Sequence, residues 1–107
     1  MRVTFFRTPA GTEPVREHLR ALPTQARAVV GAEIRMVQSH GLKDSGIYAR
    51  QIKGKLWELR IDATRIFYVV VSGPELVLLH AYQKQGQKAP KGEIETALER
   101  MRQFLND

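Results

Sequence analysis

Basic, aromatic and imidazole side chains gather near the ends of adjacent strand-like runs in the second half of the chain. His80, Tyr82 and Lys84 follow one another at every second position, and in a strand such positions share one face. Two arginines, Arg60 and Arg65, stand on either side of a short polar break between two such runs. Cations bind phosphates, rings stack on bases, and an imidazole or a phenol can transfer a proton. These five residues are therefore the candidate catalytic groups of a nucleic-acid site.

The spacing of the two arginines carries a further expectation. If the break between them is a tight hairpin, both guanidinium groups lie at one edge of the sheet and face a shared, solvent-exposed cleft. Like charges placed together repel, so their convergence indicates a bound anion, and the planar guanidinium fork suits phosphate. Lys53 and Lys55 flank the preceding turn and are expected to extend the same patch, as is Lys88 in the loop that follows. The plain alternative is that each arginine is a solvated charge or pairs with a neighbouring carboxylate.

The role of His80 has two readings. It is the one candidate that titrates near neutrality, which makes it the first choice for general acid or base, with Tyr82 next. Alternatively its ring packs under the site and serves stability alone. We expect no metal and no cofactor, because the three histidines are far apart, cysteine is absent, and no nucleotide-binding, zinc-protease or nucleophile-elbow motif is present. Trp57 and Phe67 are predicted to lie in the core.

Length and charge set the class of protein. With 107 residues, of which 43% are hydrophobic, the chain fits one soluble domain. Lysine and arginine number 17 against 11 acidic residues, a net charge of +6, which favours a polyanionic partner such as nucleic acid, an acidic protein or an acidic membrane surface. We find no stretch long enough to span a membrane and no signal-peptide pattern, so a cytoplasmic location is expected.

The elements that must position these residues follow from periodicity and turn signals. Three apolar runs separated by turn residues predict three consecutive antiparallel strands, and strict alternation puts His80 on the same face as Leu76 and Leu78. Two helices separated by Pro23 predict an αα-hairpin. The expected order is strand 2–7, a helix capped by Thr12 and ending near residue 21, helix 24–39, a weak strand 47–52, strands 55–62, 65–71 and 76–84, and a last helix that starts at Pro90. This is an α+β fold: a small antiparallel sheet of about four or five strands, with the αα-hairpin and the C-terminal helix on one face.

The stretch from Leu56 to Met101 resembles the RelE/HigB-like toxins of bacterial type II toxin–antitoxin modules, most closely the phage-derived branch. The most specific parts are LWELR, RIFY and LHAYQK. The resemblance implies a ribosome-dependent mRNA endoribonuclease, in which the ribose 2′-OH attacks the adjacent phosphate in the ribosomal A site of the small subunit. It also implies a helix-turn-helix antitoxin as partner. A strand position that is lysine in the best-known members is Glu58 here, and a C-terminal tyrosine used by some members has no match.

Carried over residue by residue, the resemblance makes the five candidates the catalytic set and the three lysines RNA-binding residues. Two other functions stay open. A ParE-like relative with the same fold would inhibit DNA gyrase without being an enzyme, and a non-catalytic relative would act only with its antitoxin in transcriptional regulation.

Overall fold

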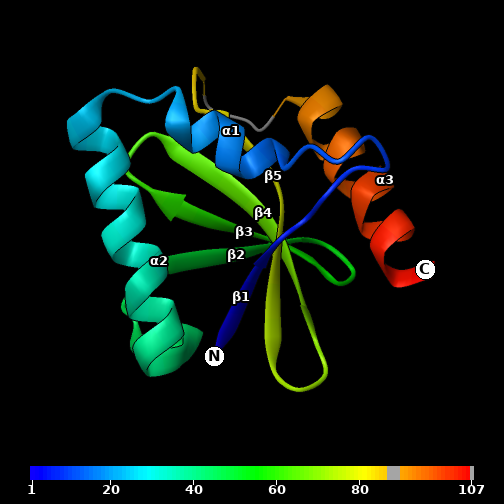
Figure 1. Cartoon of the computed structure of the whole chain (residues 1–107), viewed down its shortest axis with the longest axis horizontal. Helices are drawn as coiled ribbons and strands as arrows, with labels where there is room; N and C mark the ends of the chain where they lie inside the picture. Colours follow the sequence, from blue (N-terminus) through cyan, green and yellow to red (C-terminus); the bar gives the residue numbers. More distant parts are fainter. Residues whose placement is uncertain (87–89, 107) are drawn as a thin grey trace.

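The computed structural model describes residues 1–86 and 90–106, in which five strands and three helices follow one another in the predicted order (Figure 1). The α+β class and the whole order of elements are confirmed. The elements are β1 (Arg2–Phe5), α1 (Pro14–Arg20), α2 (Thr24–Asp44), β2 (Tyr48–Lys53), β3 (Leu56–Ile61), β4 (Thr64–Val71), β5 (Glu75–Gln83) and α3 (Lys91–Asn106).

The strands form a single sheet in the order β1-β5-β4-β3-β2. Strands β2 to β5 are antiparallel, as expected for consecutive strands joined by short turns. Strand β1 instead runs parallel to β5, so the sheet is mostly, not wholly, antiparallel. The αα-hairpin between β1 and the meander provides the long connection that a parallel neighbour needs.

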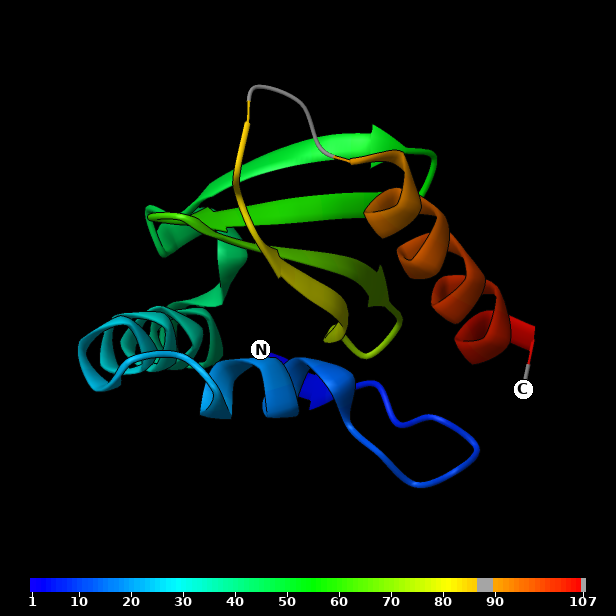
Figure 2. The same ribbon diagram turned by 90° about the horizontal axis from the view of Figure 1, so that it is seen from above.

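Helices cover both faces of the sheet, which corrects the expectation of a single covered face. On one face α1 and α2 bury a core with Leu59, Ile66 and Leu78, and on the other α3 buries a core with Leu56, Phe67 and Leu79. Figure 2 shows the sheet between the αα-hairpin and α3. The reason lies in the inner strand β4. Its side chains are buried from residue 64 to residue 69, and from Ile66 to Val69 they are hydrophobic on both faces of the sheet. We call the two sides the hairpin face and the α3 face.

A β-bulge in β5 changes which side chains share a face. Phe67 pairs with His80 and Tyr68 with Leu78, so Leu79 has no partner on β4. The extra residue reverses the alternation: Leu76 and Leu78 lie on the hairpin face, whereas His80 and Tyr82 lie on the α3 face. The prediction that His80 shares a face with Leu76 and Leu78 is therefore wrong, although His80 and Tyr82 do share one.

Proline and glycine mark the helix ends much as predicted. Pro14 opens α1, but the residue before it is Glu13 without a side-chain cap, and the hydroxyl of Thr12 bonds to that of Thr8 instead. Gly41 has a φ of +79° and kinks α2, which continues for a short turn beyond it.

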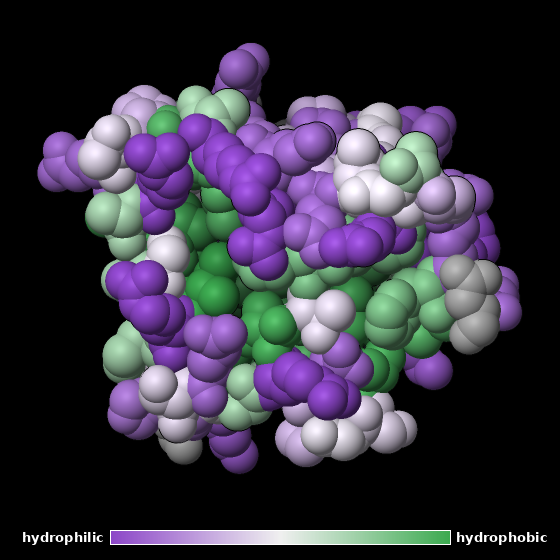
Figure 3. All heavy atoms as spheres, in the orientation of Figure 1, coloured by the Kyte–Doolittle hydropathy of each residue, from purple (hydrophilic) through white to green (hydrophobic). Residues whose placement is uncertain are grey.

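None of the helices in the described ranges is long and apolar enough to cross a membrane. Hydrophilic residues cover much of the outer surface, and hydrophobic ones emerge between α2 and the sheet (Figure 3).

Candidate nucleic-acid interface

Strand register places the candidate residues in two rows across the α3 face. Directly paired residues of neighbouring strands share a face, so pairing alone defines each row. The outer row lies next to the β3–β4 turn and consists of Tyr48, Arg60, Arg65 and Tyr82. The second row lies one pair further in and consists of Arg50, Glu58, Phe67 and His80. We call these eight residues the site face.

Arg60 and Arg65 are direct cross-strand partners, so both lie on the site face as predicted. They lie at the turn end of two inner strands and not at the lateral edge of the sheet. Only Arg60 is open to solvent. Arg65 is 7% exposed, and its Nη1 donates to the carbonyl oxygens of Asp62 and Thr64. The expected pair of solvent-facing guanidinium groups is therefore wrong for Arg65, because the two-residue turn offers it carbonyl oxygens.

The turn itself explains why an arginine is held there. Asp62 has a φ of +53°, in the left-handed region that aspartate tolerates better than most residues. The guanidinium of Arg65 binds the carbonyl oxygen of that residue and braces the turn. Arg65 thus combines a buried structural contact with a positive charge inside the outer row.

Arg60 has the geometry of a cation ready for an anion. Its Nε lies 3.6 Å from a carboxylate oxygen of Glu58, and its Cζ lies 4.9 Å from the centre of the Tyr48 ring. The Nε is buried and has no hydrogen-bond partner within the described residues. Its terminal nitrogens likewise make no hydrogen bond in that part of the chain, and the side chain is 29% exposed. A phosphate could accept from the two terminal nitrogens while Nε keeps its contact with Glu58.

Glu58 lies at the middle of the site face and is fully buried, with 0% exposure. Its Oε2 accepts a hydrogen bond of 2.9 Å from the hydroxyl of Tyr82, and its Oε1 lies 3.4 Å from Nη2 of Arg50. A buried carboxylate is tolerated when charged and hydrogen-bonding partners surround it. Glu58 therefore organises the polar part of the sheet.

Tyr82 is buried, and its hydroxyl proton is committed to Glu58. Burial, and then the hydrogen bond and the charge of Glu58, raise the pKa of Tyr82 to about 12. A phenol with so high a pKa stays protonated at neutral pH. Its oxygen can accept a second hydrogen bond, but it is a poor general base without help from Glu58.

His80 is held at both ring nitrogens by α3. Nε2 lies 2.9 Å from Oε1 of Glu93, and Nδ1 lies 2.9 Å from Nη1 of Arg100. Since an arginine only donates, Nδ1 accepts and Nε2 carries the proton. Burial lowers the pKa of His80, and the hydrogen bond to Glu93 opposes that shift only in part. These contacts favour a positioned, neutral ring, and the proton-transfer role of His80 stays a prediction.

The four lysines of the sequence prediction do not fall in one place. The exposed Lys84 follows β5, and its N–H donates to the carbonyl oxygen of Ala63 at 2.8 Å, which brings it beside the outer row. Lys53 and Lys55 lie at the β2–β3 turn, at the opposite end of β3 from Arg60. At about 3.3 Å per residue this is roughly 16 Å for Lys55. Hence they do not extend the arginine patch, and their RNA contacts stay a prediction. Lys88 lies outside the described residues.

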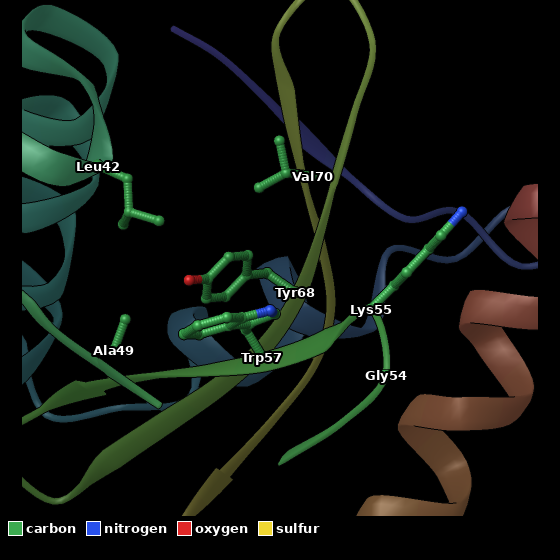
Figure 4. Close-up of a pocket in the computed structure, with 7 residues that line it drawn as sticks. All are labelled: Leu42, Ala49, Gly54, Lys55, Trp57, Tyr68 and Val70. Atoms are coloured by element: carbon green, nitrogen blue, oxygen red, sulfur yellow. The ribbon is translucent and has the colours of Figure 1, made fainter. Parts of the chain in front are cut away.

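An apolar pocket of about 440 Å³ lies on the hairpin face, away from the site face. Figure 4 shows the rings of Trp57 and Tyr68 side by side in it, as expected for cross-strand partners. Trp57 is 37% exposed, so its predicted place in the core is wrong, whereas Phe67 is fully buried as predicted. Burial alone raises the pKa of the Tyr68 hydroxyl to about 12. The pocket is lined by Leu42, Ala49, Gly54, Lys55, Trp57, Tyr68 and Val70, and it gathers no set of groups suited to acid–base chemistry.

Several residues of the interface escaped the sequence reasoning. Glu93 and Arg100 form hydrogen bonds with the two ring nitrogens of His80. Their spacing of seven residues puts them on one face of α3, and this was the only sequence feature that could have predicted the contact. His18 of α1 bonds to Gln83 at 2.8 Å, and nothing local predicts that contact between residues 65 apart. Among the described residues, no three His, Asp or Glu side chains come together as a metal site.

The fold and the site face together define a class: a small, basic α+β protein whose mostly antiparallel sheet carries arginines at one end. The sequence profile of the family "Phage derived protein Gp49-like (DUF891)" matches residues 17–102. The chain therefore belongs to this family.

Two curated relatives agree with that assignment. The chain is 36% identical over 103 residues to the "Probable endoribonuclease HigB1" of Mycobacterium tuberculosis, strains CDC 1551 / Oshkosh and ATCC 25618 / H37Rv. Each alignment covers 92% of this chain and 80% of the relative. The resemblance to the HigB-like toxins is thereby confirmed.

Proposed function

We propose that this protein is the toxin of a type II toxin–antitoxin system and cleaves mRNA bound to the ribosome. The observation that carries the proposal is the outer row of the site face, where the partly exposed Arg60 lies between Tyr48 and Arg65 and its terminal guanidinium nitrogens make no hydrogen bond within the described residues. The likeness to a probable endoribonuclease over most of the chain supports the same chemistry. The net charge of +6 suits RNA, and we place the protein in the cytoplasm, where that substrate is found.

The reaction proposed is attack of a ribose 2′-oxygen on the adjacent phosphorus. A bond from that oxygen to phosphorus forms, the bond from phosphorus to the 5′-oxygen breaks, and the 2′ proton leaves as the 5′-oxygen gains one. The products are a 2′,3′-cyclic phosphate and a 5′-hydroxyl. Charge grows on the phosphate oxygens in the transition state, so fixed cations lower the barrier. No metal is needed for that step when arginines supply the charge.

Each candidate residue receives a role from its position. Arg60 and Lys84 contact the phosphate, because both are accessible at the turn end of the sheet. Arg65 contributes charge from below, and the oxygen of Tyr82 receives a hydrogen bond from the RNA. His80 either transfers a proton or packs beneath the site and stabilises it. Its two ring contacts favour the second role. Lys53, Lys55 and Lys88 are proposed to hold RNA beyond the cleaved bond.

An in vitro cleavage assay tests the proposal. Purified bacterial ribosomes carrying an end-labelled mRNA should yield cut products with wild-type protein, and should yield them about a hundredfold more slowly with the Arg60→Ala variant, and the same mRNA without ribosomes should stay intact. Cleavage of free mRNA at the same rate would remove the ribosome dependence. Inhibition of DNA gyrase with no RNA cleavage would establish the ParE-like alternative instead. The proposed partner is a helix-turn-helix antitoxin, and adding it should abolish cleavage.

A further inference from the structure

Glu58 is the one fully buried acidic side chain among the described residues, and it lies at the centre of a basic site. The tyrosine hydroxyl and two arginines lie within 3.6 Å of its carboxylate. A carboxylate in a place that water does not reach is retained at a cost in stability, unless its partners are held in good geometry. A neutral residue would pack on this strand without that cost in stability, so the buried charge of Glu58 indicates a functional role.

The partners of Glu58 are the groups that the RNA would meet. Arg60 lies between the Glu58 carboxylate and the Tyr48 ring, so its long side chain is restrained from two sides while its terminal nitrogens stay free. The Tyr82 hydroxyl points its proton at Glu58, which turns the remaining lone pair of its oxygen away from the carboxylate. A preorganised donor loses less entropy on binding and stabilises a transition state better than a mobile one.

We propose that Glu58 is the positioning residue of this site, which fixes the guanidinium of Arg60 to bind an RNA phosphodiester and the oxygen of Tyr82 to accept a hydrogen bond from a ribose hydroxyl. It acts through these two residues and does not touch the RNA, because its carboxylate is buried beneath them. Two arginines balance its charge, so the phosphate meets a net positive surface. The inference rests on the proposed endoribonuclease function and adds to it the group that organises its cations.

A double-mutant cycle tests the coupling, with single-turnover cleavage of end-labelled mRNA on ribosomes as the readout. Glu58→Gln keeps the shape and removes the charge, and it should lower the rate about tenfold or more. In a background that lacks both groups through which Glu58 acts, Arg60→Ala with Tyr82→Phe, the same change should lower it by less than about threefold. Equal losses in the two backgrounds overturn the proposal.

Glu75 provides a matched control. It is a partly buried carboxylate of the same sheet that also binds an arginine and a hydroxyl, those of Arg2 and Thr4, at the far end of β5. Glu75→Gln should cleave at the wild-type rate. A loss equal to that of Glu58→Gln would mean that any buried-carboxylate change lowers activity, which also overturns the proposal.

A second readout needs no activity. Titration of ¹³C-labelled tyrosine rings by NMR should show Tyr82 ionising at lower pH in Glu58→Gln than in wild type, because the negative charge that raises its pKa is gone. Tyr68, whose pKa is raised to about 12 by burial alone, serves as the internal reference. An unchanged Tyr82 titration overturns the proposed contact.

The two readouts separate the two claims. If wild type and Glu75→Gln both fail to cleave, the proposed function fails, and the tyrosine titration alone decides whether Glu58 holds Tyr82. If Glu58→Gln does not fold by circular dichroism, Glu58→Asp takes its place. Aspartate keeps the charge but withdraws it by one methylene from Arg60, so wild-type cleavage by that variant would overturn the inference.

Discussion

Replacing His80 with glutamine should lower stability in a way that fades as the pH falls. The ring accepts a hydrogen bond from Arg100 at Nδ1 and donates one to Glu93 at Nε2, and it stacks on Phe67 with 6.3 Å between ring centres. Each hydrogen bond contributes about 0.5–1.5 kcal/mol net, so losing both costs roughly 1–3 kcal/mol near pH 7.5. Chemical denaturation of the two proteins measures the difference.

The pH dependence has a definite sign. Burial lowers the pKa of His80 in the folded protein below its ordinary value, while in the unfolded chain it stays near 6.5. Between these values the unfolded chain binds a proton that the folded protein does not, so the free energy of unfolding decreases as the pH is lowered, by at most about 1.4 kcal/mol per pH unit. The stabilisation is complete above about pH 6.5 and decreases below it, and glutamine lacks the effect. The gap between wild type and His80→Gln should therefore narrow from about pH 7.5 to pH 5.5.

The reasoning fails if that gap widens on acidification, because a protonated ring paired with Glu93 would then stabilise the fold. His40→Gln is the control, since His40 is exposed in α2 and far from this contact, and its free energy of unfolding should match that of wild type at every pH.

The same variants decide whether His80 transfers a proton during cleavage. If His80 only positions the floor of the site, the pH–rate profile of the surviving cleavage keeps its shape in His80→Gln, whereas a flattened profile between about pH 5 and 8 assigns the proton to His80.

Three further predictions follow from the placement of the cations. Arg60→Ala should lower single-turnover cleavage about a hundredfold and should also lower the melting temperature, because it leaves the buried Glu58 carboxylate with one arginine fewer, and a cleavage rate within about threefold of wild type would contradict this. Arg65→Ala should lower both, since it removes two contacts to turn carbonyls, about 1–3 kcal/mol by thermal unfolding; wild-type stability would refute the bracing role. Lys84→Ala should weaken binding of a 2′-deoxy-substituted, uncleavable mRNA on ribosomes and flatten its salt dependence, whereas the exposed Lys43→Ala on α2 should not, and equal effects would point to net charge alone.

Local patterns in the chain determined the elements and much of the site. Alternation along β3 placed Glu58 and Arg60 on one face, and the short turn after Ile61 made Arg60 and Arg65 partners. Pro23 and Gly41 marked the αα-hairpin and its end, since one cannot continue a helix and the other takes a positive φ. These features depend on neighbours in the sequence or on one turn of the chain, which is why periodicity and turn chemistry predict them.

Only the tertiary structure decided what surrounds each candidate. The bulge in β5 moved His80 to the face opposite Leu78, since one extra residue reverses a period of two. The packing of α3 on that face then supplied Glu93 and Arg100, which occupy both nitrogens of His80. The separation of Lys55 from Arg60, in contrast, follows from the length of β3 alone. Sequence patterning tells which side chains share a face, but burial, charge partners and accessibility come from long-range packing, and these are what separate a solvated cation from one that is already held.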